Sequence, residues 1–397
     1  MNDKDKIKDL IERCVENVIP SKKELGELLL SGKKLNIYFG IDPTGIKIHL
    51  GHAMPLRKLQ LLSDLGHKVT FLIGDFTATI GDTSDKEGER PVLTREEIEK
   101  NFATYKKQAE KVLDFTNIEV KFNSEWLKKL TFGEVLFLAG HFSVNDFVSR
   151  ELIRKRLDEG KRVSLPEVLY PLMQGYDSYH LNTDIQLGGT DQTFNMQAGR
   201  KLNKVLGKKE SFIIANGFLL GTDGRKMSKT WGNAIWLDDK PEEIYGKVMS
   251  IKDELIIEYF KFGTSVSLGE IDEIKKKLEK SDNPMEIKKR LAEKIIEELY
   301  SEKEVVMAGE HFEKTIQQKQ VVGDVMTVVV GKKELSVDEL MEIVVDKGLV
   351  ESKSQFRRLI EQGAVYVDEK RLDGDVIQLT KEVVVRIGRR RYLKLVK

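Results

Sequence analysis

The sequence contains a single cysteine, Cys14, among 397 residues. One thiol cannot form an intramolecular disulfide or a cysteine-based metal cage, and such scarcity is compatible with a reducing compartment. Long apolar runs are missing too, since no segment approaches the length of a membrane-spanning helix. The first ten residues are highly charged and lack the apolar stretch of a signal peptide. We therefore expect a cytoplasmic protein with no membrane partner.

An excess of charge of one sign is absent as well. The chain has 66 lysine and arginine residues against 65 aspartate and glutamate residues, a formal net charge of +1. Bulk charge therefore gives no argument for nucleic acid or membrane, and a polyanionic partner would have to meet local basic patches. The length, with 40% hydrophobic and 33% charged residues, is typical of a globular protein with two or three domains.

The stretch 38–52 organises the first part of the chain. It begins within an apolar segment, 35–39, that reads as a short buried strand, and the glycine- and proline-containing residues 40–45 break this strand into a turn. A helix at 53–65 and a second strand at 68–73 follow. This order predicts a βαβ unit, in which the turn lies at the carboxyl edge of a parallel sheet and the helix amino terminus faces phosphate.

Two histidines, His49 and His52, lie in this turn. A pair with this spacing can simply cap or pack the start of a helix, and a short motif alone carries that risk. The spacing also suits a metal, but no cysteine or third ligand accompanies the pair, and zinc normally needs three or four protein ligands. We therefore interpret the stretch as a nucleotide site and expect no protein-ligated metal.

The βα alternation continues to about residue 230, with strands expected at 118–122, 184–187 and 211–220. Residues 5–31 read as two helices separated at Pro20. Capping-box pairs predict helix starts, and the pairs are Thr94 with Glu97, Ser164 with Glu167, and Ser336 with Glu339. The apolar helical segment 126–160 is either a buried helix pair or a subunit interface. The domains expected are 1–230 (α/β), 231–320 (helical), 321–334 (a linker within the aperiodic stretch 313–334) and 335–397 (α+β).

Two further stretches carry chemistry. Residues 188–192, Gly-Gly-Thr-Asp-Gln, form a second glycine turn after a strand. The loop 221–230 contains Lys226 and Lys229. A solvated surface turn is the simple alternative for this loop, but cationic groups on a flexible loop are what a phosphate-rich substrate requires as charge develops in the transition state.

A family resemblance rests on two motifs together. His49-Leu50-Gly51-His52 and Lys226-Met227-Ser228-Lys229 resemble the two signatures of class I aminoacyl-tRNA synthetases. The features that look like the tyrosyl branch, bacterial type, are residues 38–44, Asp82, Tyr170 with Gln174 and Asp177, and residues 188–192. The resemblance runs from about residue 30 to the end, where the chain is similar to an RNA-binding fold shared with a small-subunit ribosomal protein.

The resemblance implies a Rossmann-type parallel-sheet catalytic domain, followed by an α-helical domain and a small α+β RNA-binding domain. It also implies a ligase that activates tyrosine with ATP to tyrosyl-adenylate and transfers tyrosine to the 3′-terminal ribose of tRNA(Tyr). ATP, with Mg²⁺, would be a substrate, and a homodimer is implied. The alternatives are a tryptophan-specific relative, against which Tyr38 and Asp177 argue as readers of a phenol, and a non-catalytic RNA-binding paralogue, against which the intact signatures argue.

The resemblance further implies a role for each site residue. The implied catalytic residues are Thr44, His49, His52, Lys86, Arg90, Lys226, Lys229 and Thr230. Tyrosine would be held at its ammonium by Asp82, Tyr170 and Gln174, near its carboxylate by Gln192, and at its phenol by Tyr38 and Asp177. ATP would be bound by Gly40, Asp42, Gly51, Gly189, Asp191 and Lys229. Two positions depart from the family: Phe39 replaces a small polar residue near the ribose, and Thr230 replaces serine but keeps the hydroxyl.

The C-terminal segment groups its basic residues. Lys353, Arg357 and Arg358 share a predicted helix, and the basic turn before Tyr392 contains Arg389, Arg390 and Arg391. A solvated charged face is the simple alternative. With the fold resemblance, these residues are expected to contact the backbone of structured RNA.

Overall fold

The structure, a computed structural model of the chain, contains two compact units, Met1–Gly309 and Glu310–Lys397. The boundary between them falls within helix α15 (Glu302–Phe312). The residues that the structure describes are 2–45, 47–82, 93–227, 231–280, 283–314, 326–350, 352–368, 370–379, 382–388 and 391–397. Within these residues, no helix is both long and apolar enough to span a membrane.

A six-stranded sheet forms the centre of the first unit, in the order β1-β6-β5-β2-β3-β4. Its strands are β1 (Val15–Ile19), β2 (Asn36–Ile41), β3 (Lys68–Ile73), β4 (Ile118–Phe122), β5 (Ile185–Gly189) and β6 (Phe212–Asn216). All neighbours are parallel except β1, which runs antiparallel to β6 at the edge. The five strands expected from the sequence are therefore confirmed, together with the parallel-sheet class.

The expected pair of N-terminal helices is only partly correct. Helices α1 (Asp3–Glu12) and α2 (Lys22–Leu30) are present, but residues 15–19 between them form strand β1. Cys14, with a φ of 53°, adopts the left-handed conformation that separates α1 from β1. Pairing of Ile19 with Ile213 places the strand on the sheet. The stretch was misread because this partner is almost 200 residues away in the sequence.

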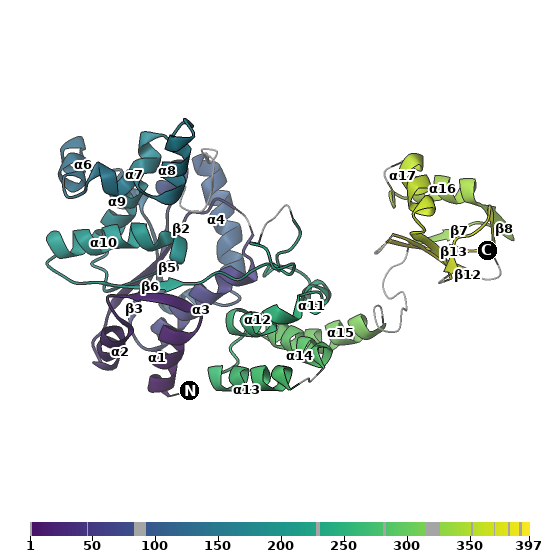
Figure 1. Ribbon diagram of the computed structural model, residues 1–397, viewed down its shortest axis with the longest axis horizontal. Helices are drawn as coiled ribbons and strands as arrows, with labels where there is room; N and C mark the ends of the chain where they lie inside the picture. The colour runs from purple at the N-terminus through teal and green to yellow at the C-terminus, as the bar shows by residue number, and fades with distance from the viewer. Residues whose placement is uncertain are drawn as a thin grey trace. The chain divides into compact units, whose positions relative to one another are not determined.

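Helices cover both faces of the sheet (Figure 1). Helices α9 (Leu165–His180) and α10 (Thr193–Val205) lie on one side of the strands, and α1, α2 and α3 (Leu50–Asp64) lie on the other. Side-chain alternation along β2 explains the two layers. Tyr38 packs in a cluster with Leu72 and Trp126, whereas Phe39 contacts Phe71 with a ring-centroid separation of 6.2 Å.

The remaining helices of the first unit connect or extend this core. Those between β3 and β5 are η1 (Thr77–Thr79), α4 (Arg95–Ala109), η2 (Phe115–Asn117), α5 (Ser124–Leu127), α6 (Phe132–Ala139), α7 (Val144–Val148) and α8 (Glu151–Asp158). Those after β5 are η3 (Thr190–Gln192), α11 (Pro241–Met249), η4 (Asp253–Leu255), α12 (Ile256–Gly263), α13 (Leu268–Glu279) and α14 (Pro284–Glu297). The prediction of helices from Pro241 to about Phe312 is confirmed.

The second unit is a small α+β fold. It contains α16 (Val337–Asp346), α17 (Lys353–Glu361), β7 (Met326–Val329), β8 (Glu334–Ser336), β9 (Val365–Val367), β10 (Lys370–Arg371), β11 (Val376–Gln378), β12 (Glu382–Ile387) and β13 (Arg391–Val396). Five strands form a sheet in the order β10-β9-β12-β13-β7, and β8 pairs with β11. Phe356, Leu340 and Val385 belong to its hydrophobic core.

Part of the stretch expected to be a linker is therefore structured. Strand β7 pairs in parallel with β13, with Val328 opposite Leu395, so the fold of the second unit begins before residue 335. Residues 326–329 escaped detection because their strand is short and its partner is at the other end of the unit. Arg391 also differs from expectation, since it begins β13 instead of belonging to a turn, and its guanidinium donates to the carbonyl of Leu349.

Candidate active site

A cleft of about 780 Å³ opens at the carboxyl ends of the parallel strands. Strands β3 and β4 follow β2 on one side, while β5 and β6 lie on its other side, so the strand order reverses between β2 and β5. Ligands of open α/β sheets bind at this kind of switch point. The predicted residues that line the cleft are Tyr38, Gly40, Asp42, Thr44, His49, Gly51, His52, Asp82, Tyr170, Gln174, Asp177, Gly189, Asp191, Gln192 and Lys226.

The amino terminus of α3 forms one wall. His49 is its N-cap, and the rings of His49 and His52 stack with a centroid separation of 3.7 Å. A Cβ atom on Gly51 would lie 3.1 Å from His49 Nδ1 and 3.3 Å from the Leu219 Cβ. Glycine at this position adds no side chain to the wall, so a ligand can approach the backbone closely. The helix dipole favours negative charge there.

The closed end of the cleft contains a buried carboxylate. Asp177 on α9 is 3% exposed and accepts hydrogen bonds from Trp126 Nε1 at 2.7 Å and Asn123 Nδ2 at 3.1 Å. Burial raises the pKa of Asp177 to about 7, although these two donors act in the opposite direction. Tyr38 is also 3% exposed, and its hydroxyl donates to Gln186 Oε1 at 3.3 Å. An apolar group with a polar tip would suit this end.

Two more carboxylates make the middle of the cleft acidic. Asp82 is 5% exposed and accepts from Gln192 Nε2 at 2.7 Å. Asp42 accepts from the Tyr170 hydroxyl at 2.8 Å and from Thr77 Oγ1 at 2.7 Å. Unlike charges attract most strongly where water is excluded, so this region favours a ligand cation such as an ammonium group.

Asp42 therefore belongs to this acidic region as well as to the turn after β2. A Cβ atom on Gly74 would approach Asp42 Oδ1 to 2.0 Å and Thr77 Oγ1 to 2.3 Å. Only glycine permits this arrangement. Sequence reasoning assigned Asp42 to ATP and did not identify Gly74 or Thr77.

The mouth of the cleft carries the described part of the lysine loop. Lys226 Nζ lies 5.8 Å from the centroid of the Phe218 ring, and Asn233 Nδ2 donates to the Lys226 carbonyl at 3.2 Å. Four predicted residues, Lys86, Arg90, Lys229 and Thr230, lie outside the described residues. Thr44 lines the cleft, and its N–H donates to the Asp42 carbonyl at 2.7 Å.

The structure adds residues that the sequence did not single out. Asn123 and Trp126, which orient Asp177, follow directly after β4. Their position just beyond the carboxyl end of a parallel strand is the signal that could have identified them. Trp236 also lines the cleft and lies 6.0 Å from His49 between ring centroids. No such signal marks Trp236, because it follows the lysine loop and precedes a helix.

Among the residues that the structure describes, no group of three or more histidine, cysteine, aspartate or glutamate side chains is placed to hold a metal ion. A magnesium ion that bound here would take its ligands mainly from water and substrate phosphates, as Mg²⁺ usually does.

Comparison with known proteins decides the family. The family described as tRNA synthetases class I (W and Y) matches residues 30–317. This chain belongs to that family. The S4 domain family matches residues 340–375, within the second unit. The class I synthetase match contains the whole cleft, and the S4 match contains α17.

Relatives of these synthetases match almost the full chain. The tyrosine–tRNA ligase of Thermotoga maritima is 41% identical over 391 residues, which cover 97% of this chain and 96% of that protein. The tyrosine–tRNA ligase of Carboxydothermus hydrogenoformans is 40% identical, covering 98% of this chain and 97% of that protein.

Solved synthetase structures share the fold. A C-terminally truncated mitochondrial tyrosyl-tRNA synthetase of Aspergillus nidulans superposes with a TM-score of 0.65 at 22% identity, covering 78% of this chain and 94% of that chain. The tyrosyl-tRNA synthetase of Archaeoglobus fulgidus, complexed with L-tyrosine, gives 0.60 at 25% identity, covering 78% and 100%.

The basic residues of the second unit differ in their surroundings. Arg357 and Arg358 are exposed on α17, whereas Lys353 forms an ion pair with Glu342 at 2.8 Å. Arg391 is half-buried against Leu349, as described above. Arg389 and Arg390 lie outside the described residues. Arg357 and Arg358 are therefore the described arginines of this set that remain available at the surface of the S4 domain.

Proposed function

We propose that the chain is a tyrosine–tRNA ligase. It activates tyrosine with ATP to tyrosyl-adenylate and pyrophosphate, and it then transfers the tyrosyl group to the 3′-terminal ribose of tRNA(Tyr). The observation that carries this proposal is the pair of Tyr38 and Asp177 at the closed end of the synthetase cleft, both 3% exposed. An indole would leave these buried polar groups without a phenol partner, which is costly, so tyrosine is favoured over tryptophan.

The tyrosine roles follow from charge and shape. The phenol lies between Tyr38 and Asp177, and the ammonium lies by Asp82, Tyr170 and Gln174. Asp42, bonded to Tyr170, strengthens the field at the ammonium. Gln192, held by Asp82 at 2.7 Å, lies by the carboxylate. This arrangement directs the tyrosine carboxylate toward the amino terminus of α3.

The amino-acid carboxylate is already a nucleophile, so activation needs no general base. It attacks the α-phosphorus of ATP, a phosphorus–oxygen bond forms, and the bond to pyrophosphate breaks. Catalysis is then positioning with electrostatic stabilisation. His49, His52 and Thr44 face the phosphates, and Lys226 approaches the departing pyrophosphate. We assign Lys86, Arg90, Lys229 and Thr230 to the same role from the family resemblance.

The nucleotide occupies the switch-point side of the cleft. Gly40, Gly51 and Gly189 leave room for it, Asp191 binds the ribose, and Lys229 contacts the phosphates. Phe39, 8% exposed and packed on Phe71, contributes no polar contact to the ribose. Magnesium enters with ATP as part of the substrate and not as a resident cofactor.

The chain divides by task. We assign catalysis to residues 1–230, a helical region on the anticodon side to 231–320, and tRNA binding to the S4-like segment from 335 to 397. Lys353, Arg357, Arg358, Arg389, Arg390 and Arg391 are the proposed contacts with RNA, of which Arg357 and Arg358 have the clearest exposure. We place the reaction in the cytoplasm, where ribosomes consume aminoacyl-tRNA.

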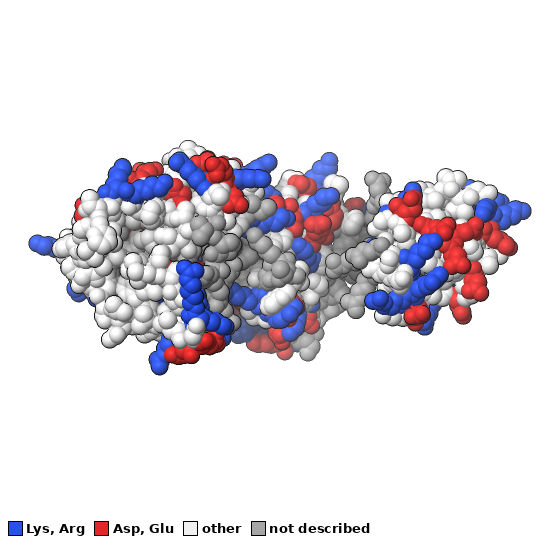
Figure 2. Space-filling view, turned by 90° about the horizontal axis from the view of Figure 1, so that it is seen from above, with Lys and Arg blue, Asp and Glu red and all other residues white. Residues whose placement is uncertain are grey.

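A homodimer through α6 completes the proposal. Phe132 is 78% exposed, Phe137 60% and Val144 74%. Figure 2 shows the end of the first unit at which α6 lies as a broad surface with few charged side chains. A patch of this kind marks an interaction site in a protein of ordinary composition.

Tyrosine-dependent exchange of pyrophosphate into ATP tests the activity. The purified chain is given ATP and pyrophosphate with tyrosine, with tryptophan, or with no amino acid. Exchange with tyrosine alone supports the proposal, exchange with tryptophan identifies the tryptophan-specific alternative, and no exchange supports the non-catalytic RNA-binding alternative.

A further inference from the structure

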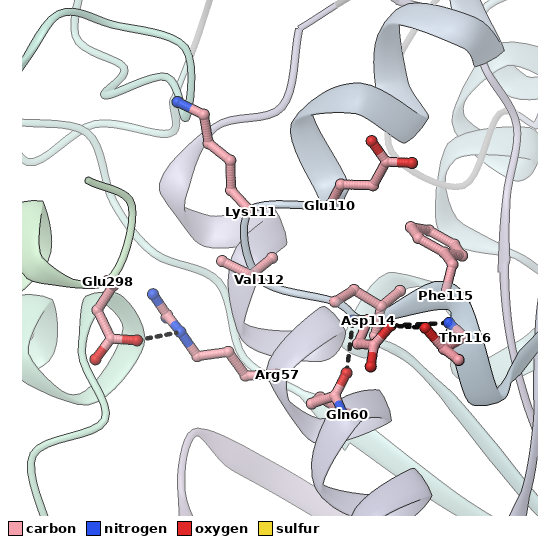
Figure 3. Close-up of a pocket in the computed structure, with 10 residues that line it drawn as sticks. Arg57, Gln60, Glu110, Lys111, Val112, Asp114, Phe115, Thr116 and Glu298 are labelled. Carbon is pink, nitrogen blue, oxygen red and sulfur yellow. Dashed lines mark hydrogen bonds and ion pairs between the residues drawn. The ribbon is translucent and has the colours of Figure 1, made fainter. Parts of the chain in front are cut away.

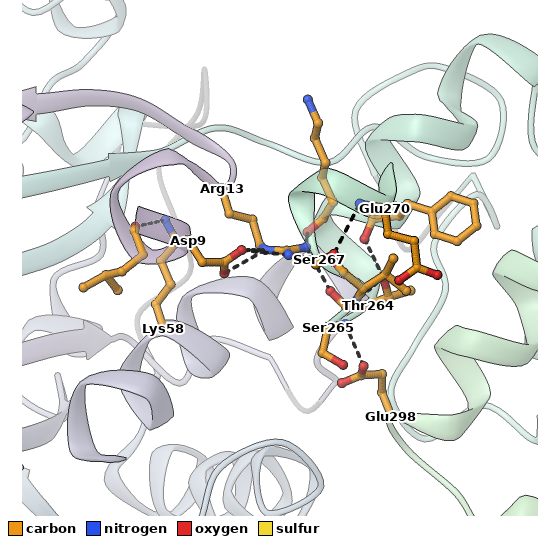
Figure 4. Close-up of polar contacts among 12 residues, drawn as sticks. Asp9, Arg13, Lys58, Thr264, Ser265, Ser267, Glu270 and Glu298 are labelled. Carbon is orange, nitrogen blue, oxygen red and sulfur yellow. Dashed lines mark hydrogen bonds and ion pairs between the residues drawn. The ribbon is translucent and has the colours of Figure 1, made fainter. Parts of the chain in front are cut away.

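The carboxyl end of α12 and the residues just after it are held by side chains from two distant elements. The final carbonyl groups of a helix have no partner within it and must be satisfied otherwise. Arg13, which follows α1 and is 5% exposed, donates to the carbonyl of Lys261 in α12 and to those of Thr264 and Val266 beyond it, the last at 2.6 Å (Figure 4). Asp9 holds the same guanidinium at 2.8 Å.

Arg57 on α3 completes this arrangement. It donates to the carbonyls of Phe262 at 2.7 Å and Gly263 at 2.9 Å. It also pairs with Glu298 at 3.3 Å, as the dashed line in Figure 3 shows. Burial lowers the pKa of the Arg57 guanidinium, while Glu298 raises it. Because the planar guanidinium satisfies two carbonyls at once, Arg57 attaches α12 firmly to α3, the helix whose N-cap is His49.

The other contacts of α12 reach the start of the lysine loop. The Tyr259 hydroxyl donates to the Leu220 carbonyl at 2.8 Å. Burial raises the pKa of the neighbouring Glu258 carboxyl, and the Leu220 backbone lowers it. Leu220 in turn forms a β-bridge with Lys226. The Leu220 carbonyl is thus held by Tyr259, and the Leu220 backbone interacts with the preceding residue of α12, Glu258.

Residues 235–237, which follow the lysine loop, are attached directly to the histidine segment. Leu50 N–H donates to the Ile235 carbonyl at 2.8 Å, and Leu237 N–H donates to the Ile48 carbonyl at 2.9 Å. These backbone bonds fix residues 235–237 beside His49. The Lys226 side of the loop is held by Asn233, which donates to the Lys226 carbonyl, and also through Leu220 and α12.

We propose that Tyr259 and Glu258 are positioning residues that set the place of Lys226 relative to His49 and His52. Arg57 fixes α12 on α3, and Tyr259 and Glu258 transmit that position to Leu220 and its bridge partner Lys226. The inference rests on the proposed function, since it assigns these residues to the ATP half of that reaction. Small displacements matter in such a site, because a shift of about 1 Å can cost about a hundredfold in rate.

The Tyr259→Phe variant tests the inference. Tyr259 is completely buried, so phenylalanine keeps the ring and removes only the hydroxyl. The rate of adenylate formation at saturating tyrosine should fall by about three- to tenfold, the scale of one hydrogen bond. Tyrosine affinity, measured by equilibrium dialysis, should stay within about twofold of wild type, because no tyrosine contact changes.

Tyr300→Phe is the matched control. Tyr300 also donates its hydroxyl to a main-chain carbonyl of the same unit, that of Asp239. Asp239 lies beyond the backbone bonds that already fix residues 235–237. This control should therefore keep the wild-type rate of adenylate formation.

Glu258 provides an independent pair of variants. Glu258→Gln keeps an oxygen acceptor for the Leu220 backbone and should remain near the wild-type rate, whereas Glu258→Ala should lose activity as Tyr259→Phe does. Lys226→Ala removes the positioned lysine itself, so its loss in the rate of adenylate formation sets the upper limit for the other variants. A stability role alone would lower rate and tyrosine affinity together and would not be rescued by glutamine.

The outcomes distinguish a failure of the proposed function from a failure of the positioning role. No tyrosine-dependent exchange by wild type would overturn the proposed function. Normal wild-type exchange, with Tyr259→Phe equal to Tyr300→Phe or with Glu258→Gln as slow as Glu258→Ala, would overturn the positioning role and leave the function intact.

Discussion

The indole N–H of Trp126 donates to the carboxylate of Asp177 at 2.7 Å. The partners come from different elements, since α5 follows β4 and Asp177 belongs to α9. Asn123 donates to the second carboxylate oxygen, so both oxygens are held by neutral donors. Among the described residues no cation pairs with this carboxylate, and burial raises its pKa to about 7 although the two donors lower it.

Tyrosine affinity should depend on pH through Asp177. In the proposed site the ionised carboxylate accepts a hydrogen bond from the phenol O–H of tyrosine, and protonation of Asp177 makes it a much weaker acceptor. We expect the affinity to fall as the pH decreases from about 8 to about 6, around the Asp177 pKa of about 7. Equilibrium dialysis should show this in wild type and a weak, flat profile in Asp177→Asn. A flat wild-type profile would contradict the phenol assignment.

The same pKa predicts the opposite trend for folding. A carboxyl group whose folded pKa is raised from 3.8 to about 7 favours the folded state most at low pH. Its contribution to the free energy of unfolding should be lost as the pH rises from about 4 to about 7. Denaturant titrations of ligand-free wild type and Asp177→Asn should differ in this window.

Removing the Trp126 donor should move the pH dependence of tyrosine affinity to higher pH. Trp126 N–H stabilises the ionised form of Asp177, so Trp126→Phe should raise the pKa of Asp177 further. The midpoint of the affinity profile should move to higher pH, and tyrosine binding at pH 7 should weaken by about tenfold or less. A variant with an unchanged midpoint would show that the indole acts only through packing.

Lys58 provides a second pH test outside the cleft. It is 3% exposed, donates to the Leu10 carbonyl at 2.9 Å, and burial lowers its pKa to about 7. Between pH 7 and about 10 the unfolded chain binds this proton more tightly, so wild-type stability should rise with pH relative to Lys58→Met. The slope should be at most about 1.4 kcal/mol per pH unit.

This stability difference can be measured by tryptophan fluorescence. All three tryptophans, Trp126, Trp231 and Trp236, belong to the first unit, so unfolding of the second unit adds no direct tryptophan signal. Cys14 beside Lys58 has its pKa raised to about 12 and stays neutral throughout this range. Parallel profiles of wild type and Lys58→Met from pH 7 to 10 would contradict the buried-lysine titration.

A charge on α6 should disrupt the proposed dimer. Phe132→Glu places a carboxylate in the exposed apolar patch, and sedimentation should give monomers with reduced exchange activity. Leu30→Glu, at a residue 55% exposed on α2, is the control and should leave the dimer intact. Phe147, also within the apolar segment, is only 4% exposed, so a charge there would disturb folding and would not report on the dimer. A wild-type monomer at micromolar concentration would contradict the proposed dimer.

The two steps of the reaction should be separable. A chain ended near Val322, which lies outside the described residues, stops before β7 and keeps the first unit whole. It should form tyrosyl-adenylate at the wild-type rate but charge tRNA poorly. Full charging by this shortened chain would refute the RNA-binding assignment of the second unit.

Exposed arginines on α17 allow a milder test of the same assignment. Arg357→Ala with Arg358→Ala should weaken tRNA charging and reduce its salt dependence, because fewer phosphate contacts release fewer counterions. Lys347→Ala removes a positive charge that pairs with Asp346 at 2.8 Å, and it should have little effect. Equal losses in both variants would indicate a response to net charge alone.

Features set by neighbouring residues could be predicted from the sequence. The helix starts at Thr94, Ser164 and Ser336 carry the expected capping boxes, because each box uses a side chain and a backbone group three residues apart. The turn after β2 and the helix start at the two histidines were predicted from the order of strand, glycine turn and helix. These patterns also involve only residues that are close in the sequence. These features predicted the α/β class, which the structure confirms, and the nucleotide site, which stays a prediction.

The contacts that give the site its properties join residues far apart in the chain. Trp126 and Asp177 are 51 positions apart, and Arg57 and Phe262 are 205 apart. A local sequence pattern does not show which distant donor will form a hydrogen bond to a buried carboxylate or to the last carbonyls of a helix. Strands β1 and β7 escaped prediction for the same reason, since each is short and is stabilised mainly by a distant partner. The sequence alone determined which chemical groups are present and in which local motifs. The Asp177 pKa and the anchoring of the lysine loop depend on the tertiary structure, because they arise from burial and long-range hydrogen bonds.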